Sequence, residues 1–308
     1  MNPSLLPSEL PRPGKGCDCT KAQHGILFND TGVEITGQSF LPATKSGGGQ
    51  RVAGAPRPCT LFSMSSRRIA AVIPARLVST RLSRKVLRMI AGRPMVEWVW
   101  RAASASGLMD PVVVATDADE VAEACRARSI PVVMTSPTCP SGSDRVREVA
   151  RQIDADIYVN IQGDEPTLTP DFFPPLLQLF DRPEVEISTL SVRCPPEEFT
   201  NPNAVKVVTA LDGRALYFSR ATIPFDRDAK GFAGYRKHLG IYAYRKAALE
   251  RFAALQPSPL ERLERLEQLR LLENGIAVYV AGAPRDTIGV DTEEDLVRAE
   301  KQLRALSS

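Results

Sequence analysis

The feature that most constrains the fold is an apolar run, Ile69 to Ile73, that stops at Pro74 and leads into a basic loop. A run of this length without polar alternation is typical of a strand buried on both faces of a parallel sheet. Proline ends the strand because it has no backbone N–H to donate to a neighbour. Ligands of open α/β sheets bind beyond the carboxyl ends of the strands, so the loop after Pro74 is the predicted ligand-binding position.

That loop has the chemistry of a polyphosphate site. Guanidinium groups offer a planar fork of donors and lysine offers a compact positive charge, and both suit phosphate oxygens. The loop has neither the glycine-lysine pattern of a Walker loop nor the three-glycine pattern of a dinucleotide site. Taken alone it would be more typical of a solvated basic surface, so the phosphate interpretation depends on the rest of the chain. Its cationic and hydroxyl side chains are Arg76, Ser79, Thr80, Arg81, Arg84 and Lys85.

Composition excludes several classes of protein. The chain has 308 residues, 43% of them hydrophobic and 24% charged, as in an ordinary soluble globular protein. A formal charge of +3 is too small to argue for a nucleic-acid partner. No window approaches about 18 consecutive apolar residues and the N-terminus lacks a secretory pattern, so neither membrane insertion nor export is expected. Six cysteines in a chain this long do not indicate a disulfide framework, and we expect a cytoplasmic protein.

Residues 1–64 differ in composition from the remainder. They are rich in Pro, Gly, Ser and Thr and have no sustained apolar period, so they cannot bury enough apolar surface to offset the entropy of ordering. We therefore expect either a disordered N-terminal extension or a protein that starts at Met64. In both cases a single folded domain is expected over residues 65–308.

From Ile69 onward, short apolar strands alternate with helical patterns. The connections are short, and this rhythm predicts a mostly parallel, doubly wound α/β sheet. Ser141 precedes one of the helices and has a side chain suited to capping its N-terminus. The predicted strands are 69–73, 111–115, 131–134 and 157–161, and the predicted helices are 95–106, 119–128 and one opened by residues 141–145.

The rhythm changes after Glu184. Strand patterns then follow one another with few helices between them, which predicts an antiparallel or mixed insertion, about residues 185–255, that serves the substrate or a subunit contact. A leucine-rich pattern over 260–273 is typical of one amphipathic helix. Thr292 and Asp295 have the spacing of a capping box, so a closing helix is expected there. The strands predicted in this half are 187–192, 204–209, 215–218, 239–244 and 276–280, and the closing helix is 292–303.

Carboxylates are the remaining candidates for chemistry. The chain has only His24 and His238, so a His-ligated zinc site or a Ser-His-Asp triad is not expected. Asp164 and Asp291 each follow an apolar strand, and carboxylates at two strand ends facing a basic loop suit a Mg²⁺ that carries phosphate oxygens. Either aspartate by itself is more often a turn residue or a helix cap, so the pair is a hypothesis about a site.

Several segments resemble known sugar-activating enzymes. The run Ile73-Pro-Ala-Arg-x-x-Ser-Thr-Arg-Leu-x-x-Lys85 resembles the signature of sugar-activating cytidylyltransferases. Further segments, in order along Arg68 to Leu303, resemble the 3-deoxy-manno-octulosonate cytidylyltransferases specifically. One departure is Ser83, where that family usually has proline. The further segments are Gln162-Gly-Asp-Glu-Pro166, Asn201-Pro-Asn-Ala-Val-Lys206, Tyr217-Phe-Ser-Arg-Ala-Thr-Ile-Pro224, His238-Leu-Gly-Ile-Tyr242, Gln256-Pro-Ser-Pro-Leu-Glu261, Leu266-Glu-Gln-Leu-Arg270 and Gly289-Val-Asp-Thr292.

The resemblance implies a fold, an activity and a set of residue roles. The fold would be the Rossmann-like fold of nucleotide-diphospho-sugar transferases. The enzyme would transfer CMP from CTP to the anomeric hydroxyl of 3-deoxy-manno-octulosonate (KDO) for lipopolysaccharide synthesis, by in-line attack with Mg²⁺, and release pyrophosphate. The family also implies a homodimer. The implied residues are Arg76, Ser79, Arg81, Lys85, Ser141, Arg145 and Gln162 for the nucleotide, Asp164 and Asp291 for Mg²⁺, and Arg220, His238, Glu267 and Gln268 for the sugar, with Arg76, Lys85, Asp164 and Asp291 as the catalytic set.

Three alternatives stay open. The acceptor could be another acidic sugar, such as 8-amino-KDO or a sialic acid, although sialic-acid enzymes do not resemble the segments around His238 and Gln268. A binding paralogue without turnover is disfavoured because Lys85, Asp164 and Asp291 are all retained. An NAD-linked oxidoreductase fits the α/β rhythm but would require the glycine fingerprint that this chain lacks.

Overall fold

The structure is a computed structural model that describes residues 67–77, 82–139 and 141–306. The predicted N-terminal extension lies outside these ranges, as do Ser79 and Arg81 of the basic loop. None of the described helices combines the length and the apolar character that a membrane span requires.

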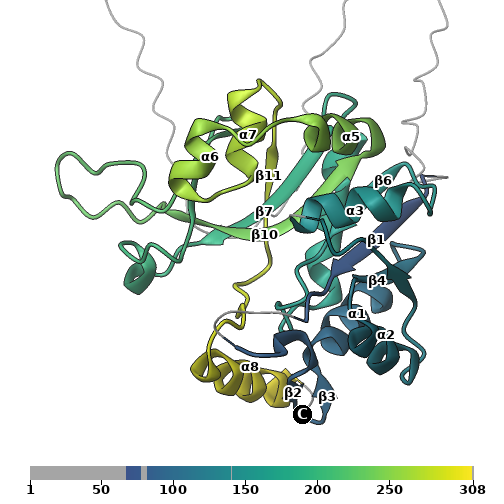
Figure 1. Cartoon of the computed structure of the whole chain (residues 1–308). Coiled ribbons are helices and arrows are strands. Elements are labelled where there is room, and N and C mark those ends of the chain that lie inside the picture. The colour runs from purple at the N-terminus through teal and green to yellow at the C-terminus, as the bar shows by residue number, and fades with distance from the viewer. Residues whose placement is uncertain (1–66, 78–81, 140, 307–308) are drawn as a thin grey trace, which may run out of the picture. The chain divides into compact units, whose positions relative to one another are not determined.

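The apolar runs form one mixed, nine-stranded sheet (Figure 1). In chain order its strands are β1 (Ile69–Pro74), β4 (Val112–Thr116), β5 (Val132–Met134), β6 (Ile157–Asn160), β7 (Ile187–Arg193), β8 (Lys206–Thr209), β9 (Ala215–Ser219), β10 (Arg236–Arg245) and β11 (Tyr279–Gly282). The main path runs β11-β7-β10-β6-β1-β4-β5, and all neighbours on it are parallel except β10, which is antiparallel to β6 and β7. The mostly parallel sheet predicted from the first half is confirmed.

Helices cover both faces of the sheet. One face packs against α1 (Met95–Ala105), α2 (Asp119–Arg126) and α4 (Phe173–Gln178), and the other against α3 (Gly142–Ala150), α5 (Lys246–Ala254) and α7 (Gln268–Glu273). Along β1, Ala71 and Ile73 belong to the first apolar core, while Ala70 and Val72 belong to the second. This double burial explains why the strand is apolar at every position. The short 3₁₀ helices are η1 (Lys85–Leu87), η2 (Pro170–Phe172), η3 (Leu179–Asp181) and η4 (Pro196–Glu198).

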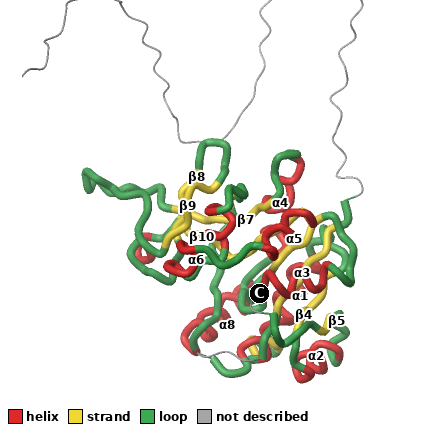
Figure 2. Tube along the Cα trace, turned by 45° about the horizontal axis from the view of Figure 1, so that its top comes forward, coloured by secondary structure: helices red, strands yellow, loops and turns green. Residues whose placement is uncertain are grey.

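The second half of the chain contains the predicted mixed insertion. β8 and β9 form an antiparallel ribbon that joins the sheet through β10. The pairing of β10 with β7 shifts register between Leu239 and Tyr242, so the strand bulges at Gly240. The loop between β9 and β10, residues 220–235, extends from the body of the structure (Figure 2).

The single helix predicted over 260–273 is wrong. The chain forms α6 (Pro259–Glu264) and then α7, with a break at Arg265, whose φ of 52° is left-handed. The break leaves Leu263 80% exposed, whereas Leu269 packs in the core. Leucines spaced by three residues therefore belong to two differently directed helices. Sequence analysis also did not predict α5, which follows β10 directly.

The C-terminal helix builds a third small core. α8 (Glu293–Leu306) packs beside the hairpin of β2 (Met89–Ile90) and β3 (Arg93–Pro94). Its predicted capping box is confirmed, since Asp295 N donates to Thr292 Oγ1 over 3.2 Å and Thr292 N donates back to Asp295 Oδ2 over 3.1 Å. The buried side chains of this core are Leu82, Ile90, Met95, Val290, Leu296, Ala299 and Leu303.

Candidate active site

The turn after β6 is central to the site because it passes against the end of β1. Ile161 N donates to the Val72 carbonyl oxygen over 3.0 Å, so the hydrogen bonding between β1 and β6 continues to the start of the turn. At Gly163 a Cβ would lie 2.9 Å from the Pro74 carbonyl oxygen, so a residue with a side chain would have to shift the backbone. Asp164 follows directly and is held at the carboxyl ends of β1 and β6.

Three of the predicted site residues converge beside this turn. Lys85 Nζ lies 2.6 Å from Asp164 Oδ2 and 2.9 Å from Asp291 Oδ1. The main chain also joins the two segments, because Val290 N donates to the Asp164 carbonyl oxygen over 2.9 Å. The Lys85 side chain is only 12% exposed, so the ion pairs are partly shielded from solvent. Burial alone would lower the pKa of Lys85, but the two carboxylates outweigh burial and raise it.

The two carboxylates suit a hard divalent cation. One oxygen from each lies within 2.9 Å of the same lysine nitrogen, so a single cation can contact both. Among the residues that the structure describes, no group of three or more His, Cys, Asp and Glu side chains is placed to hold a metal. Mg²⁺ is commonly bound by one or two carboxylates together with waters and substrate phosphates. The donor set here therefore fits Mg²⁺ delivered with a phosphorylated substrate.

Arg76 and the start of α3 form a second part of the site. Arg76 Nη2 donates to the Cys139 carbonyl oxygen over 2.8 Å, which ties the basic loop to the segment that precedes α3. Ser141 caps this helix, and its Oγ accepts a backbone N–H from the first turn. A Cβ at Gly142 would lie 3.6 Å from the Pro74 side chain, so the N-terminal end of α3 lies beside the end of β1. Helix N-termini favour anions.

Glu267 and Gln268 lie at the start of α7, and Glu267 reaches toward the start of α3. Ser143 Oγ donates to Glu267 Oε2 over 2.9 Å. Burial raises the pKa of the Glu267 carboxyl, in spite of the serine hydroxyls that bond to it. Gln268 is buried, with 7% of its surface exposed. Glu267, a predicted sugar ligand, therefore lies next to Ser141, a predicted nucleotide ligand.

Two predicted nucleotide ligands take supporting positions. Arg145 is 1% exposed, and its guanidinium pairs with Asp117 at 2.9 Å and donates to Thr135 over 2.5 Å. These partners follow β4 and β5, so Arg145 holds the ends of those strands together. Gln162 packs on β10, where a Cβ at Gly240 would lie 3.7 Å from Gln162 Cγ.

His238, in β10, has the contacts of a neutral histidine. Thr189 donates its hydroxyl to the Ile241 carbonyl oxygen over 2.8 Å, so the 3.0 Å contact with His238 Nε2 places the ring proton on Nε2. Burial lowers the pKa of His238 to about 3. The predicted role of His238 as a sugar ligand stays a prediction, and a neutral ring would serve it by a hydrogen bond and not by charge. Its Nδ1 is an acceptor and suits a hydroxyl group.

Arg220 is engaged by the protein itself. Its Nε donates to the Glu264 carbonyl oxygen over 2.7 Å and its Nη1 donates to the Pro202 carbonyl oxygen over 2.8 Å. The Glu264 carboxylate in turn accepts from Arg220 N over 3.0 Å. Arg220 thus fastens the end of β9 to α6 and to the loop before β8. These contacts give Arg220 a structural role that does not depend on a ligand.

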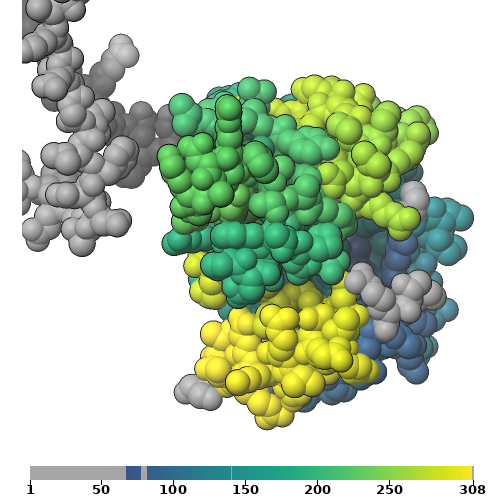
Figure 3. All heavy atoms as spheres, turned by 90° about the vertical axis from the view of Figure 1, so that its left-hand side faces the viewer, coloured from purple at the N-terminus to yellow at the C-terminus, as the bar shows by residue number. Residues whose placement is uncertain are grey.

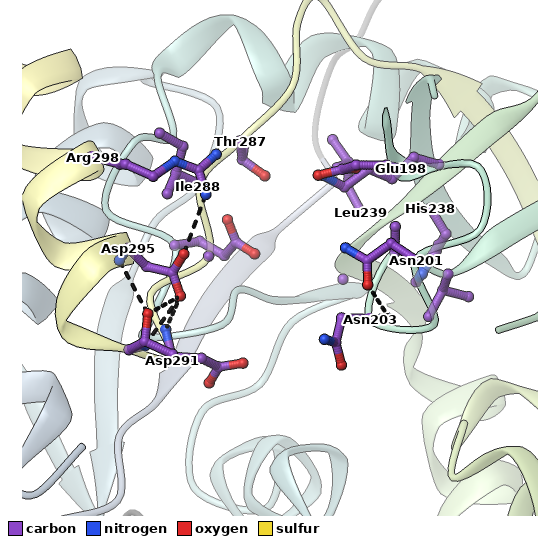
Figure 4. Close-up of a pocket in the computed structure, with 17 residues that line it drawn as sticks. Glu198, Asn201, Asn203, His238, Leu239, Thr287, Ile288, Asp291, Asp295 and Arg298 are labelled. Atoms are coloured by element: carbon purple, nitrogen blue, oxygen red, sulfur yellow. Dashed lines mark hydrogen bonds and ion pairs between the residues drawn. The ribbon is translucent and has the colours of Figure 1, made fainter. Parts of the chain in front are cut away.

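A polar cavity of about 420 Å³ opens beside Asp291. In Figure 4, one wall carries Asp291, Asp295 and Arg298, and the opposite wall carries His238 and Asn201. The cavity therefore brings a predicted metal ligand and a predicted sugar ligand to one space. Sugar hydroxyls are recognised by such mixtures of amide, carboxylate and cationic groups.

Sequence reasoning missed several residues of this cavity. Asn201 lies in a segment that carried the family resemblance, yet no role was predicted for it. Lys237 bridges Glu198 at 2.8 Å and Asp286 at 2.9 Å, and no local pattern links those three residues. Glu165 adjoins Asp164, and burial raises the pKa of its carboxyl to about 8.

Comparison with known proteins decides the family. The cytidylyltransferase family model matches residues 70–281. A 3-deoxy-manno-octulosonate cytidylyltransferase of Acidobacterium capsulatum is 67% identical over 240 residues, which cover 78% of this chain and 98% of the relative. The chain belongs to the 3-deoxy-manno-octulosonate cytidylyltransferase family. The enzyme of that name from Koribacter versatilis is 51% identical over 250 residues, 81% of this chain and 95% of the relative.

Solved structures agree with membership of the 3-deoxy-manno-octulosonate cytidylyltransferases. A CMP:2-keto-3-deoxy-manno-octonic acid synthetase complexed with CTP is 40% identical, with a TM-score of 0.74, and the match covers 78% of this chain and all of the other. The 4-diphosphocytidyl-2C-methyl-D-erythritol synthase of Anaerococcus prevotii has a TM-score of 0.53 at 14% identity, over 77% of this chain and 99% of the other. The second likeness shows a shared fold alone.

Proposed function

We propose that this chain transfers CMP from CTP to the anomeric hydroxyl of KDO and releases pyrophosphate, with Mg²⁺ as its cofactor. The observation that carries the proposal is the convergence of Lys85, Asp164 and Asp291 at the carboxyl ends of the central strands. Two carboxylates suit a metal ion and an ammonium suits phosphate oxygens, so the three groups fit a metal-assisted attack on a triphosphate. The identity of 67% to a relative that bears this activity in its name supports the same substrates.

The nucleotide is proposed to bind between the basic loop and α3. Arg76 and Lys85 would hold the triphosphate together with Ser79 and Arg81, which lie outside the described residues. The capped N-terminus of α3 at Ser141 would favour a phosphate by its free N–H groups and dipole. Arg145 and Gln162 are proposed to support the nucleotide subsite through the strands that they pack against.

Asp164 and Asp291 are proposed to hold Mg²⁺, whose chemistry would be to neutralise charge on the phosphate oxygens. Lys85 adds a positive charge on the same side of the turn. Charge on phosphoryl oxygens grows as the sugar oxygen approaches the α-phosphorus, so these groups stabilise the transition state more than the ground state. No side chain has to form a covalent intermediate, because the sugar hydroxyl is itself the nucleophile.

The sugar is proposed to occupy the polar cavity and the adjoining surface up to α7. His238 would accept a hydrogen bond from a sugar hydroxyl, and Glu267 and Gln268 would bind further hydroxyls from the α7 side. Arg220 is proposed either to bind the sugar carboxylate or to hold the walls of the site in place through the main-chain carbonyls that it contacts. Measurement of the KM for the sugar in Arg220→Lys separates these, since only a direct ligand role raises KM without lowering the melting temperature.

Pyrophosphate release tests the proposal. Purified protein with CTP, Mg²⁺ and KDO should release pyrophosphate, and Asp164→Ala should abolish the release. Asp154→Ala is the matched control, since Asp154 is an exposed aspartate that pairs with Arg68 and Lys246 away from the site. Release with 8-amino-KDO or a sialic acid but not with KDO would keep the chemistry and change the acceptor. Binding of CTP without release from any sugar would overturn the proposal in favour of a binding paralogue.

A cytoplasmic homodimer is part of the same proposal. The β9–β10 loop lies on the side turned toward the viewer in Figure 3. Phe225 and Phe232 in this loop are 85% and 43% exposed, and Leu216 on β9 is 55% exposed. Beside Phe232 lies a further cavity of about 410 Å³ lined in part by Pro195, Pro196 and Phe199. Exposed apolar patches of this kind mark protein interfaces. Sedimentation equilibrium should give twice the chain mass, and Phe225→Asp should reduce it to that of one chain.

A further inference from the structure

One ammonium group contacts both of the carboxylates that are proposed to hold the metal. Lys85 Nζ lies 2.6 Å from Asp164 Oδ2 and 2.9 Å from Asp291 Oδ1. The hydrogen bond from Val290 N to the Asp164 carbonyl oxygen keeps the two segments together, so the carboxylates face the lysine as a pair. The lysine side chain is 12% exposed, which limits its screening by solvent.

A divalent cation and this ammonium compete for the two carboxylates. Mg²⁺ requires oxygen ligands at about 2.0–2.1 Å in octahedral geometry, which leaves no room for an N–H donor on the same lone pairs. Two positive groups this close also repel, most strongly where water is scarce. Lysine has a flexible four-carbon stem, so its ammonium can leave the carboxylates and bind another anion within reach. In a nucleotidyltransferase that anion is the polyphosphate of the nucleotide.

We propose that Lys85 makes metal binding depend on the nucleotide. Without nucleotide, the Lys85 ammonium competes with free divalent cations for the carboxylates of Asp164 and Asp291. When a triphosphate binds, the ammonium pairs with the phosphates and the two carboxylates become available to the metal. Linkage is reciprocal, so the metal strengthens nucleotide binding by the same factor. The inference rests on the proposed function, because it requires that the ligand be a polyphosphate.

Equilibrium binding of Mn²⁺, followed by the electron paramagnetic resonance signal of the free ion, tests directly whether Lys85 weakens metal binding. The full chain is titrated without nucleotide or sugar as wild type, Lys85→Met and Lys85→Gln, with folding checked by circular dichroism. Both variants should bind Mn²⁺ about tenfold or more tightly than wild type, since each removes a positive charge from the carboxylates. Adding Asp164→Asn to Lys85→Met should abolish the gain.

Lys246→Met is the charge-matched control, because Lys246 pairs with the exposed Asp154, which Arg68 also contacts. It should leave Mn²⁺ affinity unchanged. Calorimetric titration of CTP with and without Mg²⁺ should give a smaller strengthening by the metal in Lys85→Met than in wild type. Mn²⁺ binding by both lysine variants that is no tighter than wild type would overturn the inference. The Mn²⁺ titration contains no substrate, so its result is independent of pyrophosphate release.

Discussion

Replacing Gly163 by alanine should disturb the active site while adding only one methyl group. That methyl would lie 2.9 Å from the Pro74 carbonyl oxygen, whereas ordinary contacts begin near 3.4 Å, so about 0.5 Å must be gained by moving the backbone. β1 is hydrogen-bonded on both sides, to β4 and to β6, so it is less able to move than the turn after β6. The turn that carries Asp164 must therefore shift. Overpacking of this kind costs about 1–3 kcal/mol of folding free energy.

The expected effect on activity is similar in free energy to the effect on stability, since a tenfold change in rate corresponds to about 1.4 kcal/mol. A displacement of about 1 Å at a reacting group can cost about 100-fold in rate, so a shift of half that size should lower kcat about tenfold. The melting temperature should fall by about 2–10 °C. Pyrophosphate release at saturating CTP and KDO, together with thermal unfolding, measures both quantities.

The matched control for Gly163→Ala is Gly282→Ala in β11. There the added methyl meets only the end of the Arg236 side chain, at 3.7 Å, which is an ordinary contact. This control should retain the wild-type kcat and melting temperature. Wild-type kcat in Gly163→Ala, or an equal loss in Gly282→Ala, would refute the argument that the close approach to Pro74 fixes Asp164.

Three further predictions follow from single side chains. The pKa of His238 is about 3 in the folded protein against 6.5 in the unfolded chain, so its contribution to stability is full above pH 6.5 and is lost as pH falls toward 3. Between pH 7 and pH 5 this loss is about 2 kcal/mol, and urea unfolding of His238→Gln should show a drop smaller by that amount. Lys206 is fully buried and donates to three main-chain carbonyls over 2.6–2.8 Å, so Lys206→Met should cost about 3 kcal/mol or more in urea unfolding, and an unchanged midpoint would contradict this role. Asp291→Asn removes one of two proposed metal ligands, and we expect the Mg²⁺ concentration for half-maximal rate to rise about tenfold or more, with no rise for the exposed Asp154→Asn.

The central sheet was predictable because its strands are buried on both faces. A strand buried on both faces, such as Ile69 to Ile73, is apolar at every position, and such a run can be recognised from the sequence alone. The change of rhythm after Glu184 likewise predicted the insertion. By contrast, the break at Arg265 depends on a left-handed residue that no local pattern marks, and the leucine spacing concealed it. Local patterns therefore predicted the buried strands, but they did not predict the break at Arg265, which leaves Leu263 exposed.

The candidate site was predictable in its composition but not in its contacts. The sequence predicted Lys85 from the basic loop, and it predicted Asp164 and Asp291 as carboxylates that follow strands. In the structure, Lys85 Nζ lies within 2.9 Å of an oxygen of each aspartate. The partners of Arg220 could not be foreseen, because they are main-chain carbonyls that carry no sequence signal. The buried position of Arg145 similarly depends on Asp117, which is distant in the sequence.

The capped C-terminal helix has a consequence for how the enzyme is made. Asp291 is 206 residues beyond Lys85 along the chain, and it is fastened by α8 packing on the β2–β3 hairpin. A nascent chain can form β1, β4 and β6 and fold around them during synthesis, since domains fold as they emerge. It has only one of the two carboxylates until the segment that carries Asp291 has left the ribosome. Translation that stops before Asp291 would therefore release a sheet without the proposed metal-binding pair, and growing chains would not sequester CTP and Mg²⁺ together.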